Sequence, residues 1–270
     1  KYQDAVSCYQ KAIEINPNHA DAYNNLGVSF YNSGDVQKAK KYYEKAIKID
    51  SNNIVSYINL GILYKNKKKF KKSKSYFERA IKIDSNNVAS HNNLGLVLNS
   101  LGYTSKAKNC LKKAIQLNPS YGSAYNSLGL VFNDSGDKQK AKKYYEKAIK
   151  LNPNSVTTNW NLHQFASNIE EALIILKKII NIDKNHIKAK AMISAIEGYK
   201  GNFKDFKSLL SSREAQHPYV RSIKWVFSLP RLPKLFFNRW FLFDAIVELT
   251  DQSKPFYEFG VWNGISFQYL

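Results

Sequence analysis

The sequence repeats itself every 34 residues, and this period restricts the chain to few folds. Four units align without gaps, at residues 20–53, 54–87, 88–121 and 122–155. Each unit has large and small residues at fixed offsets, as the first shows with Tyr23, Leu26, Gly27, Phe30, Ala39, Tyr43 and Ala46. A repeat of this length is typical of helix pairs that stack into a solenoid, so we predict an all-α fold for this region.

The spacing within a unit has a mechanical reason. Its apolar positions lie three, four and seven residues apart, which places them on one face of each of two helices. Small residues such as Gly27 and Ala39 let the two helices approach closely. Between them, Gly34 stands where a left-handed helix cap is needed, and Asp35 where the next helix starts. Lys68 occupies the glycine position of the second unit, which should cost about 1 kcal/mol if the same cap forms.

This pattern resembles the tetratricopeptide repeat, and the resemblance implies a right-handed superhelical solenoid. We expect it to cover residues 1–212, with a partial repeat at 1–19 before the four full ones. Residues 1–19 match the second helix of a unit whose first helix is absent, through Ala5, Tyr9, Ala12 and Pro17. We therefore expect the N-terminus to be a cut, with an uncovered apolar face that frays or self-associates.

Degenerate repeats are predicted for residues 156–212. The segment Glu170 to Asp183 resembles a second helix, with Ala172 and Leu176 in phase after a deletion of three residues. A further helix pair is expected from Ile187 to Leu210, with its turn at Gly201 and with Phe206 and Leu210 on the core face.

Residues 213–252 differ in composition and are predicted to form a helical connector, rich in aromatic and basic side chains and divided by Pro230 and Pro233. Such a stretch could lie on a membrane surface or stack on single-stranded nucleic acid. The interpretation we favour is a connector whose aromatic side chains pack between the solenoid and the next domain, because basic side chains can lay their stems along apolar surface.

The net charge of +20 raises the question of a nucleic-acid partner. Nearly all of the positive charge is lysine, whereas bidentate phosphate recognition favours arginine. Many lysines fall on the outer face of second helices, and the densest run, Lys65 to Lys74, is placed around a turn. We interpret these lysines as solvated, and expect no specific nucleic-acid partner, only weak, salt-sensitive binding to polyanions.

Several other kinds of site are not indicated. Cys8 and Cys110 stand three units apart, too far for a disulfide, and should be reduced thiols. The histidines form no close ligand pair, so we expect no metal site. Without a run of 18 apolar residues we expect no membrane span, and we predict a cytoplasmic protein.

Asparagines recur along the predicted inner face of the solenoid. One repeat position holds Asn25, Asn59, Asn93 and Asn161, and the position before it holds Asn24, Asn92 and Asn126. A ladder of amide side chains can pair with the backbone of an extended peptide, and this one resembles the asparagine-lined groove of the O-GlcNAc transferase solenoid. The alternative is structural, since asparagine before Leu-Gly is common in this repeat. The basic clamp of chaperone-binding members is not evident, because Asn24, Ile58 and Asn92 stand where a lysine would help.

The C-terminal stretch, Lys254 to Ser266, is predicted to be a buried strand, a glycine turn and a helix start. Its motif Glu258-Phe-Gly-Val-Trp-Asn-Gly264 resembles the first motif of class I S-adenosylmethionine-dependent methyltransferases, especially the macrocin O-methyltransferase-like group. The resemblance implies that Glu258 and Gly260 lie beside the methionyl part of the cofactor, and that Gly264 allows close helix packing. Trp262 occupies the middle glycine position of dinucleotide-binding loops, which disfavours NAD or FAD.

The sequence therefore predicts a repeat scaffold that binds a protein or peptide. Residues 253–270 would be the truncated first strand and glycine loop of an α/β, Rossmann-like methyltransferase domain. On this interpretation these 270 residues are inactive by themselves, and their intact parent uses S-adenosylmethionine. The alternative is an interaction scaffold in which the glycine motif is incidental.

Overall fold

The computed structural model describes residues 2–199, 202, 204–218, 220–221, 261–262 and 265–266. The chain divides into two compact units, Lys1–Pro153 and Asn154–Leu270. The described part of the first unit consists of helices joined by short turns: α1 Tyr2–Ile15, α2 Ala20–Asn32, α3 Val36–Ile49, α4 Ile54–Asn66, α5 Phe70–Ile83, α6 Val88–Ser100, α7 Thr104–Leu117, α8 Gly122–Asp134 and α9 Lys138–Leu151.

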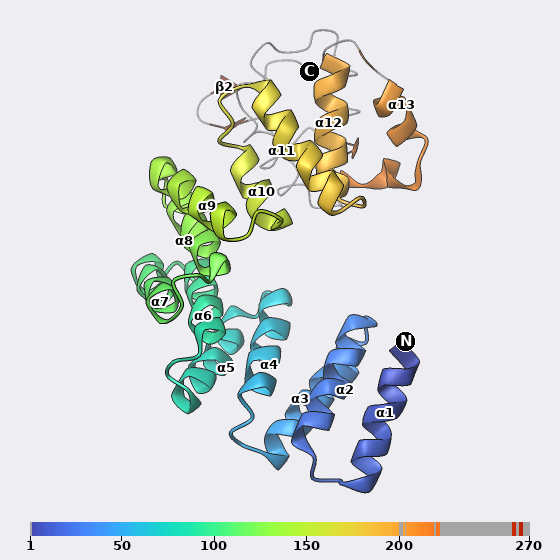
Figure 1. The fold of residues 1–270 in the computed structure, drawn as a ribbon, viewed down its shortest axis with the longest axis vertical. Coiled ribbons are helices and arrows are strands. Elements are labelled where there is room, and N and C mark those ends of the chain that lie inside the picture. The colour runs from blue at the N-terminus through green and yellow to red at the C-terminus, as the bar shows by residue number, and fades with distance from the viewer. Residues whose placement is uncertain are drawn as a thin grey trace. The chain divides into compact units, whose positions relative to one another are not determined.

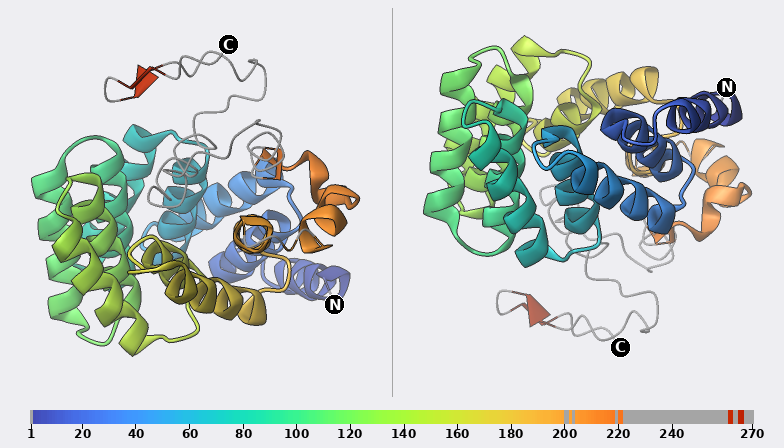
Figure 2. Two further views of the ribbon diagram at one scale, coloured as in Figure 1. Left: turned by 90° about the horizontal axis from the view of Figure 1, so that it is seen from above. Right: turned by 90° about the horizontal axis from the view of Figure 1, so that it is seen from below.

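The helices of the first unit pair in sequence order and stack along the chain, from blue to green in Figures 1 and 2. We call α2, α4, α6 and α8 the first helices and α3, α5, α7 and α9 the second helices. Each first helix packs against the second helix that follows it, and α2, α4 and α6 also pack against the first helix of the next repeat. The predicted all-α tetratricopeptide-type solenoid is thus confirmed for these repeats.

Close approach within a pair explains the glycine of each first helix. A Cβ atom built on Gly61 would lie 2.6 Å from Cε1 of Phe77, whose side chain is fully buried. Beside this contact, the hydroxyl of Ser73 donates a hydrogen bond to the carbonyl oxygen of Gly61 at 2.7 Å. The two helices of the second repeat are therefore held at a separation that leaves no room for a larger residue at position 61.

The turn inside the second repeat contains the strained residue that the sequence predicts. Gly34, Gly102 and Gly136 have φ values of 88°, 81° and 84°, and Lys68 at the equivalent position has φ 54°. The cap at Lys68 has the same backbone hydrogen bond as the cap at Gly34. The N–H of Lys69 donates to the carbonyl oxygen of Tyr64 at 2.9 Å, as the N–H of Asp35 donates to that of Phe30. Lys68 therefore adopts the left-handed conformation without the freedom of glycine.

Helix α1 has the packing of a second helix with one side uncovered. It packs against α2, and its Ala5, Tyr9 and Ala12 are only half-buried. The equivalent Ala39 and Tyr43 in the next repeat are at most 2% exposed. An apolar face of α1 is thus accessible.

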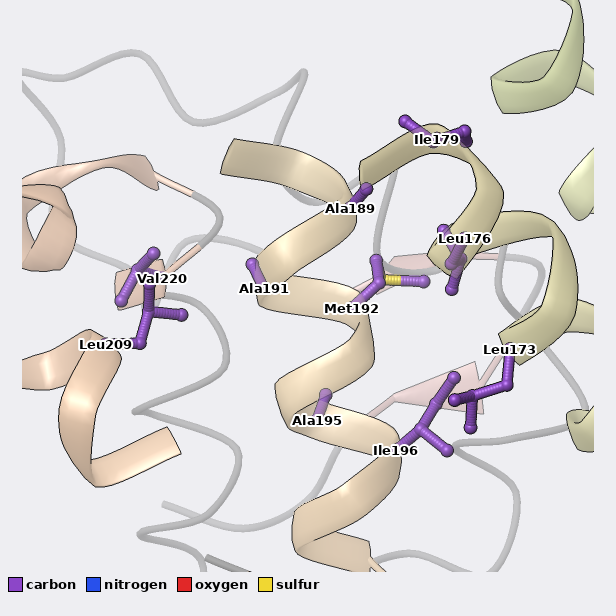
Figure 3. Packing of buried hydrophobic residues seen from close by; sticks show 10 residues of the cluster. All are labelled: Leu173, Leu176, Ile179, Ala189, Ala191, Met192, Ala195, Ile196, Leu209 and Val220. Carbon is purple, nitrogen blue, oxygen red and sulfur yellow. The ribbon is translucent and has the colours of Figure 1, made fainter. Parts of the chain in front are cut away.

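The second unit contains α10 Val156–His163, α11 Ile169–Ile182, α12 Ile187–Tyr199, α13 Lys204–Leu210 and the 3-10 helix η1 Arg213–Gln216. Its core lies on two sides of α12, as Figure 3 shows: Leu176 and its neighbours on α11 face Met192, while Leu209 and Val220 face the other side. Ala172 and Leu176 are buried, as expected from the decayed repeat pattern.

Leu210, expected on the core face, packs partly buried against the core cluster, and its neighbour Leu209 is 7% exposed. Helix α10 spans 8 residues, against 13 for α8, and it packs against α11. Gly201 and the side chain of Phe206 lie outside the described residues, as do residues 222–252 of the predicted connector.

Near the C-terminus the backbone forms a small antiparallel pairing. Strand β1, Val261–Trp262, pairs with β2, Ile265–Ser266, so that Trp262 lies opposite Ile265. The helix start expected at Ile265 is therefore replaced by a strand. The intervening sequence, Asn-Gly, is the dipeptide that most favours a two-residue hairpin loop, and this local preference accounts for the difference. Glu258, Gly260 and Gly264 lie outside the described residues.

Candidate functional site

The exposed side of the first helices carries three rows of half-buried side chains, which we call the inner face. One row is amide-rich, one is aliphatic and one is mostly polar. All members are partly accessible to solvent: Asn25, Asn59 and Asn93; Val28, Ile62, Leu96 and Leu130; Tyr31, Lys65, Asn99 and Asn133. An apolar strip flanked by hydrogen-bonding groups is the kind of surface that accommodates an extended peptide.

Asn24 does not lie on this open surface. It is 4% exposed, and its Oδ1 accepts hydrogen bonds from Ser56 Oγ at 3.1 Å and from Asn59 Nδ2 at 2.9 Å. Its own Nδ2 donates to Asn25 Oδ1 at 3.3 Å. The amide of Asn24 therefore joins the first repeat to the second, and its partner Asn59, which directly precedes Leu60 and Gly61, has the structural role expected as the alternative.

Asn92 occupies the same place in the third repeat but lacks these partners. It is 5% exposed, and its buried Oδ1 accepts no hydrogen bond within the described part of the chain. The reason is in the next repeat, where Ala124 replaces the hydroxyl of Ser56 and Ser127 replaces the amide of Asn59. The third and fourth repeats thus meet around an unsatisfied acceptor.

The remaining predicted ladder residues are half-buried. Asn25 Nδ2 and Asn59 Oδ1 make no hydrogen bond within the described residues, so both groups can serve a ligand. Asn126 lies half-buried on α8. Asn161 belongs to the second unit, where its carbonyl oxygen accepts a hydrogen bond from Gln164 Nε2 at 2.9 Å.

Lys65 was interpreted from the sequence as part of a solvated lysine run, and the structure shows this to be wrong for that residue. Its side chain is half-buried, and its Nζ donates to Asn93 Oδ1 at 3.0 Å. Burial lowers the pKa of Lys65 below its ordinary value. The signal was available in the repeat alignment, because Lys65 falls at the helical position of Tyr31 and Asn99 rather than in the turn.

The charge of the inner face is low and localised. Apart from histidine, the first helices contain only three charged residues, Asp21, Lys65 and Asp134. Asp21 accepts from Asn53 Nδ2 at 2.9 Å, and Asp134 accepts from Asn99 Nδ2 at 2.5 Å. Some lysines of the second helices form surface pairs, such as Lys74 with Glu78 at 2.8 Å. Lys138, at the start of α9, instead donates from Nζ to Asn133 Oδ1 at 2.7 Å, so the inner face carries cations at Lys65 and near Asn133.

Other kinds of site find little support in the described residues. No three His, Cys, Asp or Glu side chains there come together as metal ligands would. Among the described helices, none combines the length and the apolar character needed to cross a bilayer. Cys8 and Cys110 are both free thiols, and burial raises the pKa of Cys110.

Comparison with known proteins identifies the repeats. Family models described as "TPR repeat" and "Tetratricopeptide repeat" match residues 1–34, 20–53, 54–87, 88–121 and 122–155. The chain belongs to the tetratricopeptide-repeat family. The last four matches have the same limits as the four units defined by the 34-residue period. No curated protein sequence matches this tetratricopeptide-repeat chain at a significant level.

Solved structures show the same fold. PilF from Pseudomonas aeruginosa has 20% identity and a TM-score of 0.60, over 76% of this chain and 96% of that one. A chain of the APC/C hetero-tetramer Cut9-Hcn1 has 16% identity and a TM-score of 0.71, over 83% and 46%. TTC0263, a tetratricopeptide-repeat protein of Thermus thermophilus, has 18% identity and a TM-score of 0.59, over 66% and 98%. At these identities the likeness concerns the fold alone.

Proposed function

We propose that this tetratricopeptide-repeat chain is a scaffold that binds an extended segment of a partner protein along the inner face. The observation that carries the proposal is the set of three half-buried rows on the first helices. These side chains remain partly accessible to solvent. Burial of these side chains under a bound peptide costs little free energy, provided that their polar groups form hydrogen bonds with the peptide.

The chemistry of the rows suits a peptide in extended conformation. Asn25 Nδ2 can donate to a peptide carbonyl, and Asn59 Oδ1 can accept from a peptide N–H. Such bonds depend on the peptide backbone and not on its side chains, so they give affinity without sequence selection. The aliphatic row, represented by Ile62 and Leu96, can take apolar side chains of the partner.

A peptide array tests this proposal with a double variant, Asn25→Ala with Asn59→Ala. Asn24 keeps its bond from Ser56 in this variant, so the repeats stay joined. We expect the variant to bind array peptides about tenfold more weakly, because two backbone hydrogen bonds are lost. Asn109→Ala is the matched control, since Asn109 is an exposed amide on the second helix α7. Unchanged binding by the double variant would refute the backbone contacts assigned to Asn25 and Asn59.

The motif from Glu258 to Gly264 supports a second proposal from the sequence alone, that the protein is associated with methyl transfer from S-adenosylmethionine. Glu258, Gly260 and Gly264 lie outside the described residues, so we derive no catalytic step from this motif. Calorimetry with S-adenosylmethionine is expected to show no binding to this chain, and micromolar binding would reverse that expectation.

A further inference from the structure

The second helices carry most of the positive charge of the first unit. Helix α3 has five lysines and one glutamate, α5 has four lysines, one arginine and one glutamate, α7 has four lysines and no acid, and α9 has six lysines and one glutamate. The first helices pack against one another along the solenoid, whereas in the described part of the chain the main contacts of the second helices are with first helices. The second helices therefore present a separate, cationic outer face.

Three positions of each second helix form a stripe on this outer face, which we call the outer stripe. They are spaced four and three residues apart, so they share one side of the helix. All twelve residues are exposed, none is acidic or apolar, and nine carry a positive charge. The members are Lys41, Lys45 and Lys48; Ser75, Arg79 and Lys82; Asn109, Lys113 and Gln116; Lys143, Lys147 and Lys150.

The charges of the outer stripe are not neutralised within the first unit. Glutamates of the second helices pair with lysines outside the stripe, as Glu44 does with Lys40 at 3.3 Å and Glu78 with Lys74 at 2.8 Å. Among the described residues, no carboxylate lies within ion-pair distance of a cation of the outer stripe. Like charges on neighbouring helices therefore repel one another, and an anionic surface would offset that repulsion.

We propose that the outer stripe docks the protein on a bilayer surface rich in anionic phospholipids. Charge complementarity supports this partner, because each lysine held near such a surface is attracted to it and the contributions accumulate over an array. The stripe has no apolar side chain that would enter the acyl region, so adsorption is reversible and confined to the headgroups. Docking on this side leaves the inner face open.

A single-stranded nucleic acid fits the outer face less well. It requires aromatic rings on which bases can stack, but Tyr42 already stacks on Phe30, and Tyr144 on Phe132, with ring centroids 5.3 Å apart in both pairs. Arg79 is the one arginine of the outer stripe, and the other cations are lysines, which do not recognise a phosphate by bidentate geometry. Lipid headgroups can rearrange beneath such point charges, so they need no fixed spacing.

One hollow on the outer face is lined as a headgroup phosphate would require. It has a volume of about 340 Å³, and Asn52, Arg79, Lys82 and Ile83 line it. Arg79 and Lys82 lie one turn apart on α5, and Asn52 belongs to the turn after α3. The guanidinium can donate two hydrogen bonds to one phosphate group, and the ammonium can add another. Arg79 should therefore contribute more than Lys113, its equivalent in the third repeat.

Vesicle co-sedimentation tests the proposal with the full chain. Vesicles of phosphatidylcholine alone are compared with vesicles that contain equal parts of phosphatidylcholine and phosphatidylserine. We expect at least about tenfold tighter binding to the mixed vesicles, and a loss of most of this difference at high salt, because exposed charges are screened. Equal binding to the two kinds of vesicle, or no binding to either, would overturn the proposal.

Two double variants with the same change in net charge locate the contact. Lys143→Gln with Lys150→Gln removes two charges from the outer stripe and should weaken binding to the mixed vesicles about tenfold. Lys67→Gln with Lys69→Gln removes two charges from the exposed turn before α5 and should have a much smaller effect. Circular dichroism checks that both variants keep the helical fold. Equal losses would show that net charge is responsible, and would refute the assignment to the outer stripe.

Single variants test the hollow in the same assay. Arg79→Gln should weaken binding to the mixed vesicles several-fold more than Lys113→Gln, since Arg79 lines the hollow and Lys113 does not. Equal effects would contradict the role given to the hollow.

Competition separates a lipid surface from other anions. Poly-glutamate and a single-stranded oligonucleotide, each matched to the vesicles in total charge, should displace only a small part of the bound protein. Complete displacement by either polymer would show that the outer stripe prefers a flexible polyanion, and would overturn the bilayer as its partner.

Discussion

Asn59 Nδ2 donates to Asn24 Oδ1 at 2.9 Å, across the boundary between the first and second repeats. With the bond from Ser56 Oγ at 3.1 Å, it satisfies a buried acceptor twice. The corresponding acceptor in the third repeat, Asn92 Oδ1, has neither bond, because Ala124 and Ser127 stand at the partner positions. The same side chain is therefore stabilising at one repeat boundary and costly at another.

This contrast predicts that Ala124→Ser with Ser127→Asn stabilises the protein. Both changes copy the donors found around Asn24, so they should satisfy Asn92 and raise the free energy of unfolding by about 1–2 kcal/mol. Urea unfolding followed by circular dichroism measures the change. In the background Asn92→Leu, which has no acceptor, the same pair of substitutions should give no gain. A gain of equal size in that background would show that Asn92 is not the reason.

The left-handed residue in the second turn gives a second prediction. Lys68→Gly should raise the free energy of unfolding by about 1 kcal/mol, because glycine adopts positive φ without the steric cost. Lys67→Gly is the control, since Lys67 has φ −82° and gains nothing from glycine. The melting temperatures of the two variants should shift in opposite directions relative to the unaltered protein. A shift in the same direction would contradict the conclusion that the positive φ of Lys68 is destabilising.

The close contact between the two helices of the second repeat gives a third prediction. Gly61→Ala should destabilise the protein by about 1–3 kcal/mol, because the new methyl group would meet the buried ring of Phe77 at 2.6 Å. Gly122→Ala is the control: there a Cβ meets Ala148 and Leu151 at 3.4 Å, and the higher helix propensity of alanine should prevail. Comparison of their unfolding midpoints in urea tests the difference.

Buried tyrosines give a fourth prediction, on alkaline stability. Burial raises the pKa of Tyr43 and of Tyr76 to about 12, from an ordinary value of 10.0. The folded protein thus holds these protons more tightly than the unfolded chain, so their contribution is fully present below pH 10 and is lost as pH rises toward 12. Tyr43→Phe should flatten the fall in stability over this window, measured by urea unfolding at several pH values. An unchanged slope would contradict the assignment.

The repeat period was enough to predict the fold of the first unit. Glycine and other small residues at fixed offsets indicate where the two helices of a repeat approach closely. Glycine in the turns indicates a positive φ, so the strain at Lys68 could be predicted. Both requirements are local, because a single residue type satisfies each of them. The shortened helix α10 was harder to define, because the repeat pattern decays after α9.

The candidate site could be predicted only in part. Asn24 and Asn25 both recur in the sequence, but neighbouring helical positions point about 100° apart, so one lies between repeats and the other on the inner face. Their different roles depend on residues one repeat away. The prediction that Lys65 is solvated was wrong, because the run of lysines gives no sign of where α4 ends and the exposed turn begins.

Photo-crosslinking tests the central claim most directly, that the inner face of the first helices binds an extended peptide. An extended peptide of alternating leucine and serine would carry a benzophenone near its centre, and mass spectrometry would identify the attached positions. The account predicts attachment to α4 and α6, near Ile62 and Leu96, with less attachment in the double variant Asn25→Ala with Asn59→Ala. Attachment mainly to the second helices, such as α5 or α7, would contradict it.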